Sequence, residues 1–107
     1  MVDRTFLKDY ETSIKSYRHC TTIIQEQKKS KKFYIGATQN PDKRLTEHVA
    51  EKNMKNMYLL CKVPTKYKTE KLEQKLIKRF NTDHCINQTG GGEGIEEGIN
   101  YIYLLLH

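Results

Sequence analysis

Residues 33–52 read FYIGATQNPDKRLTEHVAEK, and this stretch decides the fold. Residues 33–37 are rich in aromatic and β-branched side chains and predict a strand. Asn40, Pro41 and Asp42 then predict a helix start, because asparagine is a good N-cap and proline suits the first helical position. The aspartate faces the positive end of the helix dipole. A strand followed directly by a helix is therefore the centre of the predicted fold.

Patterns on both sides of this stretch extend the prediction. Apolar residues at roughly helical spacing in residues 3–17 predict a leading helix. The β-branched run over residues 19–25 predicts a strand, which a short lysine-rich loop would join to residues 33–37 as a hairpin. Residues 57–63 predict a third strand, and a second helix with a threonine cap is expected over residues 69–80.

We therefore predict a single α/β domain of the α+β type with an extension at each end. With 107 residues, the chain has room for one compact core. The core is expected over residues 19–94, after an N-terminal helical extension over residues 1–18. Residues 95–107 are expected to be an apolar C-terminal tail, strand or helical turn, that packs on the core or on a second copy of it. The run over residues 99–106 would otherwise expose a large apolar surface.

The charge balance favours a polyanionic partner. There are 19 lysines and arginines against 13 aspartates and glutamates, for a net charge of +6 at pH 7. Nucleic acid is the first choice of partner and a membrane surface the second. No apolar stretch approaches the ~18 residues of a membrane-spanning helix. Since nucleic acid is preferred to a membrane surface, we expect no membrane partner.

Cysteine usage indicates the compartment. The three cysteines, Cys20, Cys61 and Cys85, lie far apart and include no C-x-x-C pair. A disulfide framework and a structural zinc site are therefore not expected. We expect buried thiols in a protein of a reducing intracellular compartment, cytoplasmic or nuclear.

The second predicted helix contains a carboxylate on its apolar side. At about 100° per residue, Glu73 falls inside the apolar arc of this helix, which consists of Leu72, Leu76, Ile77 and Phe80. A buried carboxylate is costly unless it is paired or holds a metal ion. Glu73 is thus either a metal ligand or a salt-bridged structural residue at the edge of the arc.

The helix that begins at Pro41 contains a candidate phosphate site. Arg44 and His48 are four residues apart and share a strip of the helix, next to a stripe of Leu45 and Val49 that we expect to be buried. Arginine offers a planar positive group to a phosphate, and histidine donates to phosphate or exchanges a proton near neutral pH. The alternative is a solvated helix face.

The predicted strand over residues 33–37 contains a candidate ligand position. Alternation puts Tyr34 and Gly36 on the same face, so the tyrosine lies over a residue without a side chain. This leaves room for a ligand backbone. The alternative is a packed strand tyrosine with its hydroxyl at the surface.

Taken in order, these signals resemble the GIY-YIG nuclease family. The string YIGATQNPDKRLTEH over residues 34–48 matches the family's pattern, as do Glu73 on the next helix and Asn87 ahead of a glycine-rich run. The resemblance covers about residues 19–94. It implies a small three-stranded antiparallel sheet flanked by helices, with the site on one face. The implied activity is metal-dependent endonuclease hydrolysis of DNA phosphodiester bonds.

The resemblance also implies a role for each residue of the site. Tyr34 would activate or orient the attacking water, and Arg44 and His48 would hold the scissile phosphate. Asn87 would brace the site or contact the substrate. Glu73 would ligate a single Mg²⁺ or Mn²⁺, which polarises the phosphate and stabilises the leaving oxygen.

One feature departs from the family's pattern. A further tyrosine is expected ten or eleven residues before Tyr34, where this chain has Ile24 or Ile23, and no Gly-Ile-Tyr triplet occurs. The main alternative is therefore a catalytically impaired DNA-binding module that keeps the fold and the basic surface. An RNA-binding protein is a further alternative, although no RRM or KH signature is present.

The DNA partner is expected to be duplex or branched. A lysine cluster in the predicted hairpin turn would contact phosphates and consists of Lys28, Lys29, Lys31 and Lys32. No helix-turn-helix or zinc finger is visible in the sequence. Specificity would then come from a partner protein, a homodimer or the loops of the domain itself.

Overall fold

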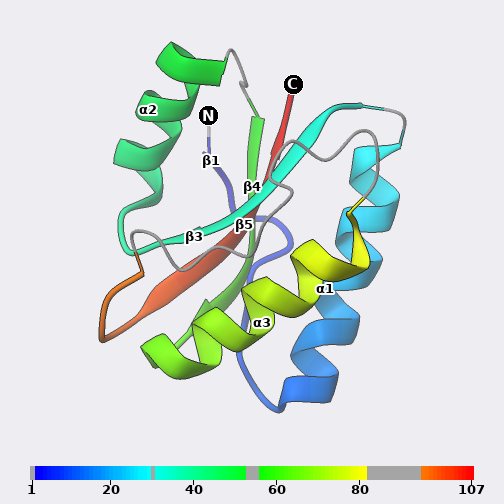
Figure 1. Cartoon of the computed structure of the whole chain (residues 1–107), viewed down its shortest axis with the longest axis vertical. Coiled ribbons are helices and arrows are strands. Elements are labelled where there is room, and N and C mark those ends of the chain that lie inside the picture. Colours follow the sequence, from blue (N-terminus) through cyan, green and yellow to red (C-terminus); the bar gives the residue numbers. More distant parts are fainter. Residues whose placement is uncertain (1, 30, 53–55, 82–94) are drawn as a thin grey trace.

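The computed structural model describes residues 2–29, 31–52, 56–81 and 95–107. Its elements, in chain order, are β1 (Val2–Asp3), β2 (Lys8–Asp9), α1 (Ser13–Lys28), β3 (Phe33–Thr38), α2 (Pro41–Lys52), β4 (Asn56–Val63), α3 (Lys66–Arg79) and β5 (Asn100–Leu106). The strands form one sheet, with α1 and α3 side by side on one face and α2 on the other (Figure 1).

The sheet places β5 between two antiparallel neighbours. The strand order is β1-β4-β5-β3, and β2 also pairs with β4. β5 pairs with β3 along the whole of that strand, from Leu106 opposite Phe33 to Tyr101 opposite Thr38. β4 lies antiparallel on its other side, whereas β1 and β2 each pair parallel to β4. β3 is therefore an edge strand among the described residues, and β5 is an inner strand.

The predicted α+β class is confirmed. The expected three-stranded antiparallel sheet corresponds to β3, β5 and β4, and the two-residue strands β1 and β2 make the sheet five-stranded and mixed. The sheet separates two apolar clusters, a larger one under α1 and α3 and a smaller one under α2. Residues of β5 alternate between them, with Leu104 in the larger cluster and Tyr103 and Leu105 in the smaller one.

The first helix is displaced from its predicted position. The helix expected over residues 3–17 is wrong, because β1 and β2 occupy its first part and α1 begins only at Ser13. Thr12 fixes this start, since its side chain accepts a hydrogen bond from the Lys15 backbone N–H at 3.1 Å.

The strand predicted over residues 19–25 is also wrong, and so is its hairpin with β3. These residues continue α1, where Cys20, Ile23 and Ile24 lie at helical spacing and face the larger cluster. Burial of one helical stripe thus outweighs the β-propensity of the isoleucines and threonines. β3 pairs with β5 instead, a strand from the other end of the described chain.

The helix after β3 is confirmed, with one change in its buried face. α2 begins at Pro41, and Asn40 caps it by accepting from the Lys43 N–H at 3.2 Å. Val49, which was expected to be buried, is 45% exposed. His48 is buried instead. The side of α2 that faces the sheet therefore includes Leu45 and His48, where Leu45 and Val49 were predicted.

The later elements are shifted or reassigned. The third predicted strand is confirmed as β4. α3 begins at Lys66 and not at Thr69, because the Thr65 side chain caps it by accepting from the Lys68 N–H at 3.2 Å. Residues 95–107 contain β5, so the segment expected as a tail packed on the core is part of the sheet itself.

Two of the three cysteines are buried thiols, as expected. Cys20 and Cys61 lie in the larger cluster, and Cys85 falls outside the described residues. Within the described part of the chain, no helix has the length and apolar character needed to cross a membrane.

Candidate active site

The centre of the candidate site is a cross-strand pair. Gly36 of β3 lies opposite Tyr103 of β5, and Tyr34, two residues before the glycine, points to the same face. A Cβ added at Gly36 would overlap the Tyr103 hydroxyl and would lie 2.9 Å from Cε1 of Tyr34. The Tyr103 hydroxyl thus fills the space that was predicted to admit a ligand backbone, and only glycine fits beneath it.

α2 brings His48 to this hydroxyl. His48 Nε2 lies 2.8 Å from Tyr103 Oη, and the histidine is only 1% exposed. The His48 ring is 4.8 Å from the Tyr34 ring, centroid to centroid, and the rings of Tyr34 and Tyr103 are stacked at 6.2 Å. The structure therefore places His48 and Tyr34 together, and it excludes the solvated helix face as the setting of the histidine.

Arg44 reaches the same hydroxyl from one turn earlier in α2. Its side chain is about one-third exposed and forms an ion pair with Glu47 at 3.2 Å. Partial burial opposes the charge of the guanidinium, but hydrogen bonds to Tyr103 and Glu47 outweigh this effect and raise the pKa of Arg44. Arg44 is therefore a permanent positive charge at the site.

The hydroxyl of Tyr103 is neutral at pH 7. Burial raises the pKa of Tyr103 above its usual range, although the hydrogen bond and charge of Arg44 act in the opposite direction. The proximity of Tyr34 and of the Glu73 carboxylate adds to the rise in this pKa. A neutral hydroxyl can accept from Arg44 and donate to His48, which assigns the histidine tautomer whose Nε2 is unprotonated.

Glu73 approaches from α3, the helix layer opposite α2 (Figure 1). It is 3% exposed among Leu72, Leu76 and Ile77, so its predicted place on the apolar arc is confirmed. Its charge contributes to the raised pKa of Tyr103, which puts the carboxylate within electrostatic range of the site. Its role as a metal ligand stays a prediction.

The donor set fits a hard divalent ion held by one carboxylate. Among the described residues, no three His, Cys, Asp or Glu side chains gather closely enough to bind a metal ion by themselves. Mg²⁺ does not need such a cage, because it keeps several waters and binds through one or two carboxylates plus substrate phosphates. The buried oxygens of Glu73 meet this requirement.

A cleft adjoins the site on the side of Arg44. Its volume is about 270 Å³, and it is lined by the turn between β3 and α2 together with the first turns of α2, including Thr38, Asn40, Lys43 and Arg44. Backbone and side-chain donors with two cations make this cleft suitable for a phosphate strand. Glu47 and Glu96 also line it, so two carboxylates accompany the two cations, and Glu47 pairs with Arg44.

The remaining predicted residues are not brought to this cluster. Asn87 lies outside the described residues. The predicted lysine cluster lies in the turn between α1 and β3 and not in a hairpin turn, and Lys29, Lys31 and Lys32 are exposed there. Lys28 Nζ sits 5.5 Å from the centre of the Phe33 ring. Contact of these lysines with DNA stays a prediction.

Sequence reasoning missed Tyr103. The residue lies in the segment that was expected to be an apolar tail, where it appears as one of several apolar side chains. A signal was present, because strand alternation over residues 100–106 puts Tyr101 and Tyr103 on one face. The pairing of that face with Gly36 joins residues far apart in the sequence, so only the tertiary structure shows it.

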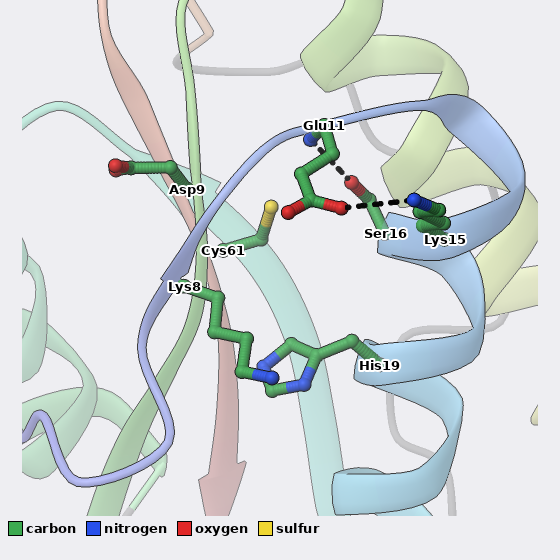
Figure 2. A pocket seen from close by; sticks show the side chains of 7 residues that line it. All are labelled: Lys8, Asp9, Glu11, Lys15, Ser16, His19 and Cys61. Atoms are coloured by element: carbon green, nitrogen blue, oxygen red, sulfur yellow. Dashed lines mark hydrogen bonds and ion pairs between the residues drawn. The ribbon is translucent and has the colours of Figure 1, made fainter.

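A second cavity, of about 240 Å³, lies between the β2 segment and α1 (Figure 2). Several of its polar groups have protein partners: Lys15 pairs with Glu11 at 3.8 Å, and Ser16 Oγ accepts from the Glu11 N–H at 3.1 Å. His19 Nε2 lies 2.7 Å from the Phe6 carbonyl oxygen. None of the site residues described above lines this cavity, so we assign it a structural role.

Comparison with known families agrees with this geometry. A model of the GIY-YIG catalytic domain matches residues 18–87, well over half of the 107-residue chain. We found no match to the chain among curated proteins or among solved structures. The match begins in α1 and includes β3, α2 and α3, while β5 lies beyond it. The protein therefore belongs to the family of the GIY-YIG catalytic domain, whose general activity is nuclease-type cleavage of DNA.

Proposed function

We propose that the protein is a metal-dependent DNA endonuclease that hydrolyses phosphodiester bonds. The main support is the convergence of a guanidinium, an imidazole and two tyrosine rings on the face of the sheet that α2 covers. Arg44 and His48 come from α2, Tyr34 from β3 and Tyr103 from β5. Phosphodiester hydrolysis needs a cation for the phosphate charge and protonatable groups for the water and the leaving oxygen.

Each side chain has a role that its surroundings allow. Arg44 is always charged and lines the cleft, so it binds the scissile phosphate and offsets the charge that builds in the transition state. His48 is held against Tyr34 and Tyr103. Its imidazole would donate a hydrogen bond to the phosphate oxygens or exchange a proton with them. Tyr34 is only half-buried, so its hydroxyl orients the attacking water.

Glu73 would hold a single Mg²⁺ or Mn²⁺. The bound ion supplies Lewis-acid polarisation of the phosphate and stabilises the leaving oxygen. The apolar neighbours of Glu73 on α3 exclude water around its carboxylate, which strengthens its attraction for a cation.

DNA is the proposed substrate, either duplex or branched. The net charge of +6 favours a polyanion, and Arg44 places a permanently charged guanidinium in the adjoining cleft. We further propose that a homodimer or a partner protein supplies specificity.

The competing proposal is a DNA-binding module that no longer cuts. One observation favours it. Ile23 and Ile24 stand where the family's further tyrosine is expected, and both lie in α1 within the larger apolar cluster. Such a protein would bind DNA with the same salt dependence as the nuclease but would leave the substrate intact.

Incubation with supercoiled plasmid and with branched oligonucleotides separates the two proposals. The nuclease nicks or cuts DNA with Mg²⁺ or Mn²⁺ and stops when EDTA is added. Arg44→Ala should reduce the rate by about 100-fold. Arg18→Ala is the matched control, because Arg18 is an exposed arginine of α1 that does not line this cleft, and this variant should cut nearly as the wild type does. Binding without cleavage under all of these conditions would support the module.

A further inference from the structure

We propose that β5 completes the active site, and that the hydroxyl of Tyr103 positions Arg44 and His48 for cleavage. This inference rests on the proposed nuclease function. It extends the functional domain beyond residues 18–87, which the family match covers, to a strand at the other end of the described chain.

The first argument is the position of β5 in the sheet. A tyrosine was expected on a strand paired with β3 and placed before it in the sequence, but residues 19–25 form part of α1. β5 is the strand that pairs with β3 through all six of its residues. The strand beside β3 is therefore β5, which follows α3 in the sequence, and not a strand that precedes β3.

The second argument is the set of contacts that one hydroxyl makes. Tyr103 Oη lies 2.8 Å from His48 Nε2 and also accepts a hydrogen bond from Arg44. Tyr103 is 1% exposed, so both contacts form away from bulk water, where a hydrogen bond is stronger. Both partners of the hydroxyl are residues that the proposed function places at the phosphate, so Tyr103 acts through them as a positioning residue.

The third argument is that Arg44 has two partners, of which the Tyr103 hydroxyl is one. Its other partner is Glu47, one turn further along α2, at 3.2 Å. If the Tyr103 hydroxyl were absent, the guanidinium would be held by Glu47 alone and would lose the contact that fixes it at the Tyr103–His48 pair. A shift of about 1 Å in a positioning group can reduce a rate by about 100-fold.

The fourth argument is the glycine beneath the hydroxyl. Any side chain at Gly36 would overlap the Tyr103 hydroxyl. The glycine of the Tyr34-Ile35-Gly36 string is therefore required by the tyrosine of β5, which links the two strands in one site.

The test compares two phenylalanine substitutions on one strand. Tyr103→Phe removes only the hydroxyl and keeps the ring stacked near Tyr34. Its single-turnover cleavage rate at saturating DNA should fall by about 100-fold, while the Kd for DNA in EDTA stays near the wild-type value. Tyr101→Phe is the matched control, since Tyr101 lies on the same face of β5 and is half-buried. Its rate should stay near that of the wild type.

A double-mutant cycle with His48 separates positioning from a general loss of structure. If Tyr103 acts through His48, adding Tyr103→Phe to a His48→Ala protein should slow cleavage far less than it slows the wild type. The ¹⁵N shifts of the His48 ring should also change in Tyr103→Phe, and they report on the folded protein even if the variant melts at a lower temperature.

Three results would overturn the role of Tyr103: a wild-type rate in Tyr103→Phe, equal losses in Tyr103→Phe and Tyr101→Phe, or fully multiplicative effects with His48→Ala. Each of these requires a wild type that cuts, so the proposed nuclease function would still stand. A wild type that cuts no DNA with either metal would overturn the proposed function, and the role of Tyr103 with it.

Discussion

At the scale of single residues, Glu73 combines deep burial with a negative charge. It lies among apolar residues of α3 and is 3% exposed. Burial of a carboxylate costs free energy that its partners must offset. Removal of the charge should reduce cleavage if Glu73 holds the metal, and should reduce stability if Glu73 is a structural ion-pair partner. Substitution can therefore tell the two roles apart.

Glu73→Gln keeps the shape of the side chain and removes the charge that would hold the metal. Cleavage should fall by about two orders of magnitude or more. Affinity for DNA should hold or rise, because a negative charge near the phosphates is gone. The melting temperature should also hold or rise, because a neutral amide is cheaper to bury than a carboxylate. Plasmid nicking and thermal melting, with and without Mn²⁺, measure both effects.

Glu70→Gln is the matched control on the same helix. Glu70 is half-buried and pairs with Lys66 at 3.9 Å near the surface, so its loss should change neither cleavage nor melting by much. A Glu73→Gln protein that nicks DNA at the wild-type rate would show that Glu73 is not the metal ligand. A lower melting temperature, with activity lost only through unfolding, would indicate a structural glutamate.

At the scale of elements, the turn between α1 and β3 concentrates positive charge. Lys29, Lys31 and Lys32 are exposed in this turn, and β3 begins directly after it and continues to Tyr34 and Gly36. A strand that begins at a basic turn and ends at the proposed phosphate site would offer one continuous path for a DNA backbone. The lysines are therefore expected to contribute to binding and not to chemistry.

Replacement of Lys28, Lys29, Lys31 and Lys32 by Gln should weaken DNA binding and flatten its salt dependence. Each phosphate contact contributes roughly −0.9 to the slope of log K against log salt for duplex DNA. Loss of the cluster should reduce the slope by more than about one unit, as measured by fluorescence anisotropy over a range of salt concentrations.

Removal of four lysines from α3 is the control for net charge. Lys68, Lys71, Lys75 and Lys78 are exposed on that helix, so their replacement by Gln removes the same charge elsewhere. The slope should then change less than it does for the turn. An unchanged salt dependence in the turn variant would show that the turn is not part of the DNA interface.

At the scale of the whole molecule, β5 holds the sheet together. It separates β3 from β4 and contributes buried side chains to both apolar clusters. Without it, β3 would lose its only strand partner among the described residues, and α1 and α3 would cover an incomplete face. Stability and activity should therefore depend on this strand together.

A chain shortened after Gly98 should not form a stable fold. The change removes an inner strand whose residues from Ile102 to Leu106 are all buried, so the loss of apolar burial exceeds the few kcal/mol by which a small domain is stable. Circular dichroism and thermal melting measure the outcome. Deletion of His107 alone, which is exposed, is the control and should melt near the wild type. A shortened chain with the wild-type melting temperature would contradict the observed strand order.

The sequence by itself determined what depends on neighbours along the chain. The start of α2 followed from Asn40 and Pro41, and the inward position of Glu73 followed from helical periodicity. The order of these residues indicated the family, because Tyr34, Arg44 and His48 follow one another at short spacing and Glu73 lies on the next predicted helix. Capping and helical periodicity depend only on residues that are close in the sequence, so they can be read without knowing the rest of the fold.

Only the tertiary structure decided which segment lies beside β3. Residues 19–25 have the β-propensity of a strand, yet they form a helix because Cys20, Ile23 and Ile24 are buried together only at helical spacing. Tyr103 enters the site because β5 pairs with β3 across the length of the chain. Such a pairing is set by which apolar faces can be buried together, and that depends on all the elements at once.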